Sequence, residues 1–201
     1  MIAIIDYDAG NIKSVEKALQ SLGEEVIITR DEDVLLSADK VVLPGVGAFG
    51  DAMERLNEYG LISVIQKIVK KKTPFLGICL GLQLLFDSSE EAPGIKGLGI
   101  LPGKIVRFPS DYGLKIPQIG WNSLSQPNKG RLFKGIDDGE FVYFVHSYYL
   151  CAQDLNDVVA TTEYGVTVHA AVERDNIFAC QFHPEKSSDV GLRILKNFID
   201  L

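Results

Sequence analysis

Cys79 is the residue of this 201-residue sequence whose type and position best suit a catalytic nucleophile. It follows the apolar run at residues 74–78, lies between Gly77 and Gly81, and is followed directly by helix-forming residues. A strand that turns sharply into a helix presents a side chain at the turn, and a helix N-terminus favours a thiolate over a thiol. A lone cysteine also serves as a small buried apolar residue, so both interpretations stay open from this stretch alone.

A nucleophilic cysteine needs a base, and the sequence has three histidines. His146 and His169 lie in apolar strand-like segments, where a structural role is the default. His183 is followed by Pro184 and Glu185. Residues two apart in an extended segment face the same side, about 6.5 Å apart, so Glu185 is placed to orient the His183 imidazole. The tripeptide HPE alone is a weak signal that also fits the polar end of a strand.

Attack of a nucleophilic cysteine on a carbonyl carbon also needs hydrogen-bond donors for the oxyanion that forms. The N–H of Leu80 follows the cysteine directly, and the PGVG turn at residues 44–47 offers a second N–H from a neighbouring strand end. In isolation, PGVG fits a tight turn that permits close packing equally well.

The first half of the chain supplies the elements that would position these groups. Four apolar runs read as buried strands, at residues 2–5, 26–29, 41–43 and 75–78. Between them, periodic apolar residues predict helices over residues 12–22 and 51–72, the second broken near Gly60. This alternation predicts an α/β fold with a doubly wound, mainly parallel sheet flanked by helices. The turns DYDAGN, PGVG and GICLG then share the edge at the strands' carboxyl ends, where ligands collect.

The second half reads differently, as short strands and turns. The strands are expected at residues 105–108, 140–150, 158–164, 166–173 and 177–183. A final helix directs Val190, Ile194, Leu195 and Phe198 inward, with Ser187 or Ser188 as its candidate cap. We therefore expect an added antiparallel β section and a single domain over residues 1–201.

Composition excludes several classes of protein. The net charge of −7 and pI near 5.0 argue against a nucleic-acid binder, which needs a basic face. No run is long and apolar enough to span a bilayer, and the N-terminus reads as a core strand and not as a signal peptide. Three cysteines without a C-x-x-C spacing indicate free thiols and a cytoplasmic location.

Taken together, the motifs resemble the class I, triad-type glutamine amidotransferases. GICLG with Gln83 two residues on, PGVG upstream and QFHPE near the C-terminus carry the resemblance, which runs from about residue 4 to 198. Four further motifs narrow the resemblance to one branch of the family, namely DYDAGN, PQIGWN, VHSYY and QFHPEKS. Two positions depart from the pattern: Leu82 stands where relatives often have methionine or histidine, and Asp8 where many have glycine.

The resemblance implies glutamine hydrolysis to glutamate and ammonia through a cysteine thioester, with no metal or other cofactor. It implies Cys79 as nucleophile, His183 as general acid and base, and Glu185 as its orienting partner. It implies an oxyanion hole formed by Val46, Gly47 and Leu80. It also implies that glutamine is bound by a second set of residues, namely Gly45, Gln83, Glu91, Ser147 and Tyr148.

A protein of this kind does not act alone, because ammonia released into neutral water is protonated. The resemblance implies a separate (β/α)8-barrel cyclase subunit and a heterodimer. For the interface we expect Asn11, Trp121, Tyr143 and Lys186, although a buried core indole is an equally good interpretation of Trp121. We hypothesise that the lone subunit is slow because PGVG does not present its N–H. The alternatives are a glutaminase of pyridoxal phosphate or anthranilate synthesis, a non-catalytic scaffold subunit and a stand-alone cysteine hydrolase.

Overall fold

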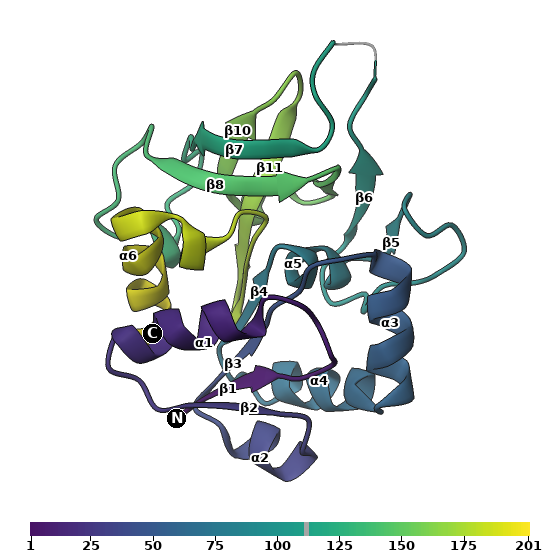
Figure 1. Ribbon diagram of the computed structural model, residues 1–201, viewed down its shortest axis with the longest axis vertical. Helices are drawn as coiled ribbons and strands as arrows, with labels where there is room; N and C mark the ends of the chain where they lie inside the picture. Colours follow the sequence, from purple (N-terminus) through teal and green to yellow (C-terminus); the bar gives the residue numbers. More distant parts are fainter. Residues whose placement is uncertain (111–112) are drawn as a thin grey trace.

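A seven-stranded sheet runs through the centre of the molecule in the computed structural model, which describes residues 1–110 and 113–201 (Figure 1). Its order is β10-β11-β12-β4-β3-β1-β2. Five strands are parallel to one another, namely β1 (Ile2–Ile5), β2 (Val26–Thr29), β3 (Lys40–Leu43), β4 (Phe75–Ile78) and β12 (Ile177–Cys180). The other two, β10 (Val158–Glu163) and β11 (Thr167–Arg174), pair antiparallel. The predicted fold class, a mainly parallel sheet with an antiparallel section, is confirmed.

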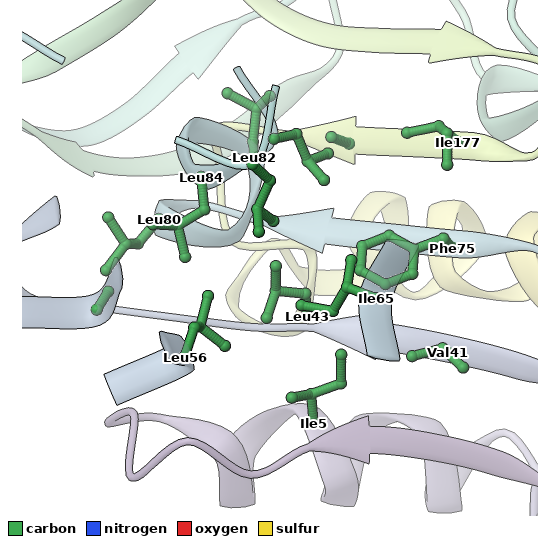
Figure 2. Packing of buried hydrophobic residues seen from close by; sticks show 14 of the residues in the cluster. Ile5, Val41, Leu43, Leu56, Ile65, Phe75, Leu80, Leu82, Leu84 and Ile177 are labelled. Carbon is green, nitrogen blue, oxygen red and sulfur yellow. The ribbon is translucent and has the colours of Figure 1, made fainter. Parts of the chain in front are cut away.

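Helices cover both faces of this sheet (Figure 1). They are α1 (Ile12–Ser21), α2 (Glu32–Ser37), α3 (Phe49–Glu58), α4 (Leu61–Lys70), α5 (Leu80–Leu84) and α6 (Ser188–Ile199). Alternate residues of β1 belong to different cores: Ile5 packs with α3 and α4, and Ile4 packs with α1 and α6. Figure 2 shows part of the first of these cores, to which Leu43 of β3, Phe75 of β4 and Leu82 of α5 belong. Burial on both faces explains why the strands read as continuous apolar runs.

Two smaller sheets lie outside the main sheet, and apart from the parallel pair of β5 and β6 their strands pair antiparallel. A three-stranded sheet has the order β5-β6-β9, and a two-stranded ribbon pairs β7 with β8. Their bounds are β5 (Ser88–Ser89), β6 (Gly103–Arg107), β7 (Gln118–Ser123), β8 (Phe141–His146) and β9 (Tyr148–Ala152). Three 3-10 turns complete the set, namely η1 (Arg131–Phe133), η2 (Leu155–Asp157) and η3 (Pro184–Lys186).

Some expected boundaries differ. The segment at residues 140–150 is divided at Ser147 into β8 and β9, which join different sheets. The strand expected to reach residue 183 ends at Cys180, because the chain turns there toward η3. Ser187 occupies the N-cap position of α6, but its hydroxyl donates to the His183 carbonyl at 2.6 Å and does not cap the helix.

The helices of the first half include one expected break and one unexpected addition. The break near Gly60 separates α3 from α4, and Gly60 there has φ +69°. The short helix α2 was not expected; its first turn is capped by the Asp31 carboxylate, which accepts from the Val34 N–H at 3.0 Å. Across the described residues, every helix falls short of the length and apolarity that crossing a bilayer requires.

Candidate active site

Cys79 occupies a strained turn between β4 and α5. Its φ of 55° and ψ of −105° are unusual for a residue with a side chain, and they aim that side chain out of the sheet edge. The two flanking glycines are required by close backbone approach. A Cβ on Gly81 would lie 1.8 Å from the Leu43 carbonyl oxygen, and one on Gly77 would lie 2.7 Å from the Gly81 oxygen. The GICLG spacing therefore builds a nucleophile turn packed directly against β3.

His183 reaches the same edge because β12 lies next to β4 in the sheet. The Cys79 N–H donates to the Cys180 carbonyl at 2.8 Å, which holds the two strand ends together. Three residues further on, the His183 imidazole lies near enough to Cys79 for that side chain to affect its pKa, and its buried Nε2 has no hydrogen-bond partner among the described residues. Its Nδ1 lies 2.7 Å from Oε1 of Glu185, whose side chain is fully buried. The structure thus brings the three predicted triad residues into contact.

Two further side chains complete this arrangement. The Asn11 amide nitrogen donates to Oε1 of Glu185 at 2.5 Å, so that oxygen is held by Asn11 as well as by His183. The Gln181 amide nitrogen lies 3.7 Å from the Cys79 sulfur, where it can donate to a thiolate. The nucleophile and the carboxylate each have an amide that restricts their orientation.

The charge balance of the triad favours a protonated imidazole. Burial by itself lowers the pKa of His183, but the neighbouring Cys79 side chain and the hydrogen-bonded Glu185 carboxylate outweigh burial and raise the pKa to about 9. An imidazolium at neutral pH stabilises a neighbouring thiolate and can give its proton to a leaving group. His146 behaves in the opposite way, because burial and, to a smaller extent, the charge of His183 lower its pKa to about 4.

This shift predicts how stability depends on pH. The folded pKa of His183 lies above the unfolded value of about 6.5, so its stabilising contribution is complete below that pH and is lost as pH rises through about 9. We expect the unfolding free energy of wild type, relative to His183→Gln, to fall between these two pH values in urea titrations. His169→Gln is the control. Burial lowers the pKa of His169, so the unfolding free energy that His169 contributes rises with pH below about pH 6.5 and does not fall between the two pH values. A pH-independent gap between wild type and His183→Gln would contradict the prediction.

The N–H groups of Leu80 and Val46 are not placed to bind an oxyanion together in this structure. The Leu80 N–H donates to the Gly45 carbonyl at 3.2 Å. Because a trans peptide directs its C=O and N–H in opposite directions, the Val46 N–H of that same peptide unit points away from Leu80. Rotation of this one peptide unit would release the Leu80 N–H and turn the Val46 N–H toward it. Gly47, next in the chain, has φ +108°, a conformation suited to glycine at a turn of this kind.

A pocket of about 300 Å³ opens beside the Cys79 sulfur. Most of the residues predicted for the oxyanion hole and for glutamine binding line it, together with four others: Val46, Gly47, Cys79, Leu80, Gln83, Glu91, Pro117, Val145, His146, Ser147 and Tyr148. Gly45, His183 and Glu185 are not among the lining residues and lie behind its wall. The volume is at the lower end for ligand pockets and suits a small substrate.

Two of these residues have structural partners that limit what they can offer a ligand. The Gln83 amide donates to the Tyr148 carbonyl at 3.1 Å and to Gln181 at 3.0 Å, so it braces the pocket wall. One Glu91 oxygen accepts from the Phe49 N–H at 2.8 Å and satisfies the start of α3. Both therefore support the site, and their contact with glutamine stays a prediction.

The four residues expected at the interface lie in different surroundings. Trp121 is 53% exposed, so of the two interpretations the surface one holds. Tyr143 is half-buried and meets the Trp121 ring edge-on at 6.1 Å, and Lys186 is exposed. Asn11 is half-buried against the triad. Their contact with a partner stays a prediction.

Several residues of the site were not expected from sequence. Tyr7, Gln181, Pro117 and His146 each touch the pocket or its supporting turns. Pro117 and Gln181 lie inside the quoted motifs PQIGWN and QFHPE, so their motifs carried the signal. Tyr7 and His146 likewise lie inside the quoted motifs DYDAGN and VHSYY, but their contacts join distant segments, and a motif does not reveal such contacts.

Comparison with known proteins shows the family to which the chain belongs. The chain matches the family described as "Glutamine amidotransferase class-I" over residues 3–201. It is 52% identical to the imidazole glycerol phosphate synthase subunit HisH of Syntrophotalea carbinolica, with each chain covered in full. It is 50% identical to the HisH subunit of Moorella thermoacetica, covering 100% of this chain and 94% of that one. The chain belongs to the class-I glutamine amidotransferases, in their HisH branch.

Solved structures of a glutamine amidotransferase and of a glutaminase domain share the fold. A crystal structure described as a glutamine amidotransferase superimposes with a TM-score of 0.76 at 20% identity, covering 100% of this chain and 98% of the other. The glutaminase domain of Trypanosoma brucei CTPS, with bound acivicin, gives a TM-score of 0.67 at 16% identity over 99% and 93% of the two chains. At these identities the likeness concerns the fold alone.

Proposed function

We propose that this protein is the glutaminase subunit of imidazole glycerol phosphate synthase in histidine biosynthesis. It hydrolyses glutamine to glutamate and ammonia. The ammonia passes to a separate (β/α)8-barrel cyclase subunit, which makes imidazole glycerol phosphate and an aminoimidazole carboxamide ribotide. The observation that carries the proposal is the contact of Cys79, His183 and Glu185 beside a pocket of about 300 Å³.

The geometry supports acyl transfer in two steps. The Cys79 thiolate attacks the side-chain amide carbon of glutamine, and the His183 imidazolium gives its proton to the leaving nitrogen, which departs as ammonia. His183, now neutral, takes a proton from water, and the resulting hydroxide attacks the thioester carbon. The carbon–sulfur bond breaks, glutamate leaves, and the thiolate–imidazolium pair is restored. Glu185 keeps the ring oriented and stabilises its charged form throughout.

Both steps develop negative charge on the former amide oxygen, which needs two N–H donors. Leu80 is the nearest donor, and its N–H is bonded to Gly45. We infer that the lone subunit turns over slowly until the peptide between Gly45 and Val46 rotates. A partner that favours the rotated peptide would then switch the enzyme on when an acceptor for ammonia is present.

The partner's docking surface is proposed on the β7–β8 ribbon. We call its outward side the apolar ribbon face, formed by Ile119, Trp121, Phe141, Tyr143 and Val145. Ile119 and Phe141 are 56% and 55% exposed, whereas alternate residues such as Phe144 are fully buried. An apolar surface of this kind marks protein contact. The Tyr143 carbonyl accepts from the His183 N–H at 3.0 Å, so this surface is continuous with the triad.

The test compares glutamate release by the purified protein alone, with the cyclase subunit, and with the cyclase subunit plus its ribonucleotide ligand. We expect slow release alone and a rise in kcat when both are present, with the ammonia nitrogen recovered in the imidazole product. A protein that released glutamate rapidly alone, and no faster with the cyclase, would instead be a stand-alone hydrolase. Failure of a glutamine-analogue warhead to label Cys79 would favour the scaffold alternative.

The same assay tests the docking surface. Trp121→Ala removes the indole from the centre of the apolar ribbon face, and such anchors typically contribute about 2 kcal/mol or more to binding. We expect the cyclase concentration for half-maximal stimulation to rise roughly 30-fold or more, since 1.4 kcal/mol is about tenfold. Leu155→Ala, at a position 64% exposed in η2 and outside the ribbon, is the control and should leave that concentration unchanged. Equal behaviour of the two variants would place the interface elsewhere.

We also propose that the glutaminase is one domain spanning residues 1–201 and that it works in the cytoplasm with its thiols reduced. The location is supported by three free cysteines, of which Cys151 is exposed. The domain assignment is supported by the family match over residues 3–201 and by β12, which places the C-terminal part of the triad inside the main sheet.

A further inference from the structure

Tyr7 is a buried polar residue that takes no part in the two acyl-transfer steps. Only 1% of it is exposed, and its hydroxyl donates to the Pro44 carbonyl at 2.8 Å. The hydroxyl lies directly beneath the PGVG turn, because a Cβ added to Gly45 would be only 2.1 Å from its oxygen. Burial raises the pKa of Tyr7, so the group remains a neutral donor.

Tyr7 and Leu80 hold two consecutive peptide units of that turn. The unit between Pro44 and Gly45 is held by the Tyr7 hydroxyl, and the unit between Gly45 and Val46 by the Leu80 N–H. A single peptide unit can rotate through the ψ of the residue before it and the φ of the residue after it, while its neighbours keep their positions. The bond from Tyr7 therefore permits rotation of the second unit and prevents displacement of the first.

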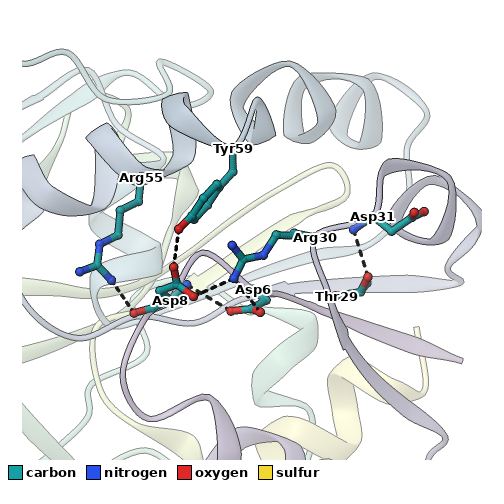
Figure 3. Close-up of polar contacts among 7 residues, drawn as sticks. All are labelled: Asp6, Asp8, Thr29, Arg30, Asp31, Arg55 and Tyr59. Atoms are coloured by element: carbon teal, nitrogen blue, oxygen red, sulfur yellow. Dashed lines mark hydrogen bonds and ion pairs between the residues drawn. The ribbon is translucent and has the colours of Figure 1, made fainter.

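The two residues that flank Tyr7 in the chain are held by polar contacts, which Figure 3 shows. The Arg30 guanidinium donates to the carboxylates of Asp6 at 2.9 Å and Asp8 at 2.7 Å, the two residues that flank Tyr7 in the chain. Asp8 adopts φ +60° and also accepts from the hydroxyl of Tyr59, whose ring lies under the Arg30 guanidinium at 4.2 Å. These contacts attach the loop after β1 to α3 and to the end of β2.

We propose that Tyr7 is a positioning residue for the oxyanion hole: its hydroxyl anchors the Pro44 carbonyl so that rotation of the next peptide delivers the Val46 N–H beside that of Leu80. The inference rests on the proposed glutaminase function and extends it. Tyr7 is not one of the residues that line the pocket. Its effect is confined to the stability of the transition state, because the pocket walls that bind ground-state glutamine are formed by other residues.

The test is Tyr7→Phe, which keeps the buried ring and removes one hydroxyl. We expect kcat for glutamine in the cyclase-stimulated complex to fall roughly fivefold, the equivalent of about 1 kcal/mol for one neutral hydrogen bond. KM should stay within about twofold, because ground-state binding is unaffected. The rate at which iodoacetamide alkylates Cys79 should equal that of wild type, because the triad is intact.

Tyr164→Phe is the matched control. Its hydroxyl also donates to a backbone carbonyl, that of Lys115, at 2.7 Å, but far from the PGVG turn in the sequence and outside the pocket. It should leave kcat and KM unchanged. Arg30→Gln, a surface change that loosens the loop around Tyr7, should lower kcat in the same direction by a smaller factor.

The outcomes separate this inference from the function on which it rests. An active, stimulated wild type with an unchanged kcat in Tyr7→Phe would overturn the role of Tyr7 alone. So would a rise in KM at constant kcat, or a slower alkylation of Cys79, since either would place Tyr7 in the pocket or triad. A wild type inert toward glutamine with and without cyclase would overturn the proposed function itself.

Discussion

Replacing Cys79 by alanine is expected to lower cyclase-stimulated glutamine hydrolysis roughly 10³-fold or more, because no thioester can form. His183 and the N–H donors remain, but without the sulfur they have no acyl intermediate to stabilise. Glutamate release by the saturated complex measures the effect. Residual turnover within tenfold of wild type would show that another group is the nucleophile.

The remaining thiols provide the controls for this loss. Cys151→Ala changes an exposed thiol outside the pocket and should retain wild-type turnover. The complex containing Cys79→Ala should still make the imidazole product when ammonium salt replaces glutamine, because only ammonia production is removed. Loss of ammonia-dependent synthesis as well would indicate that the substitution has disrupted the complex.

Gly81→Ala is expected to have the largest effect on stability. Its Cβ would lie 1.8 Å from the Leu43 carbonyl oxygen and 2.9 Å from the Leu43 carbonyl carbon. Both belong to the backbone of β3, in the interior of the main sheet, which cannot move without separating strands. We expect a loss of roughly 4 kcal/mol or more and a Tm lowered by about 10 °C, or failure to accumulate as folded protein.

Gly50→Ala is the matched control, because Gly50 also packs closely but against side chains. A Cβ there would lie 3.2 Å from the Ile95 Cδ1 and 3.4 Å from the Ala92 Cβ. Ile95 is 41% exposed and can move, and alanine is a better helix former than glycine by about 1 kcal/mol in α3. Its Tm should be unchanged or slightly higher. Similar melting of the two variants would show that the turn around Cys79 can relax.

Much of the main sheet could be predicted from sequence because its strands are buried on both faces. Such strands leave uninterrupted apolar runs, as at Ile2–Ile5 and Phe75–Ile78, and glycines mark the turn at Cys79. The approach of His183 to Cys79 did not follow from chain order, because the strand at residues 177–183 was expected in the antiparallel section, whereas β12 lies parallel to β4 in the main sheet. The predicted spacing of His183 and Glu185 depended on a local, two-residue relation in an extended segment, although the chain there turns into η3 and does not continue as a strand.

The rest depended on contacts between distant segments. Residues 140–150 are divided between β8 and β9 because the two halves pair with different strands. The two halves have similar composition, so the sequence does not reveal the division. The helix α2 has only six residues, too few to show a period of 3.6. The bond between the Leu80 N–H and the Gly45 carbonyl joins backbone groups 35 positions apart, and backbone groups leave no trace in side-chain pattern.

The hydrogen bond between the Cys79 backbone N–H and the Cys180 backbone carbonyl has a consequence for inhibitor design. It joins the strands that carry the nucleophile and the imidazole, so the reactive sulfur is prepared for attack before any partner binds. Chloroketone analogues of glutamine, which need only a poised sulfur, should therefore inactivate the free subunit. Aldehyde analogues form a hemithioacetal oxyanion, and they should gain affinity only in the assembled synthase, which offers a way to target the working complex selectively.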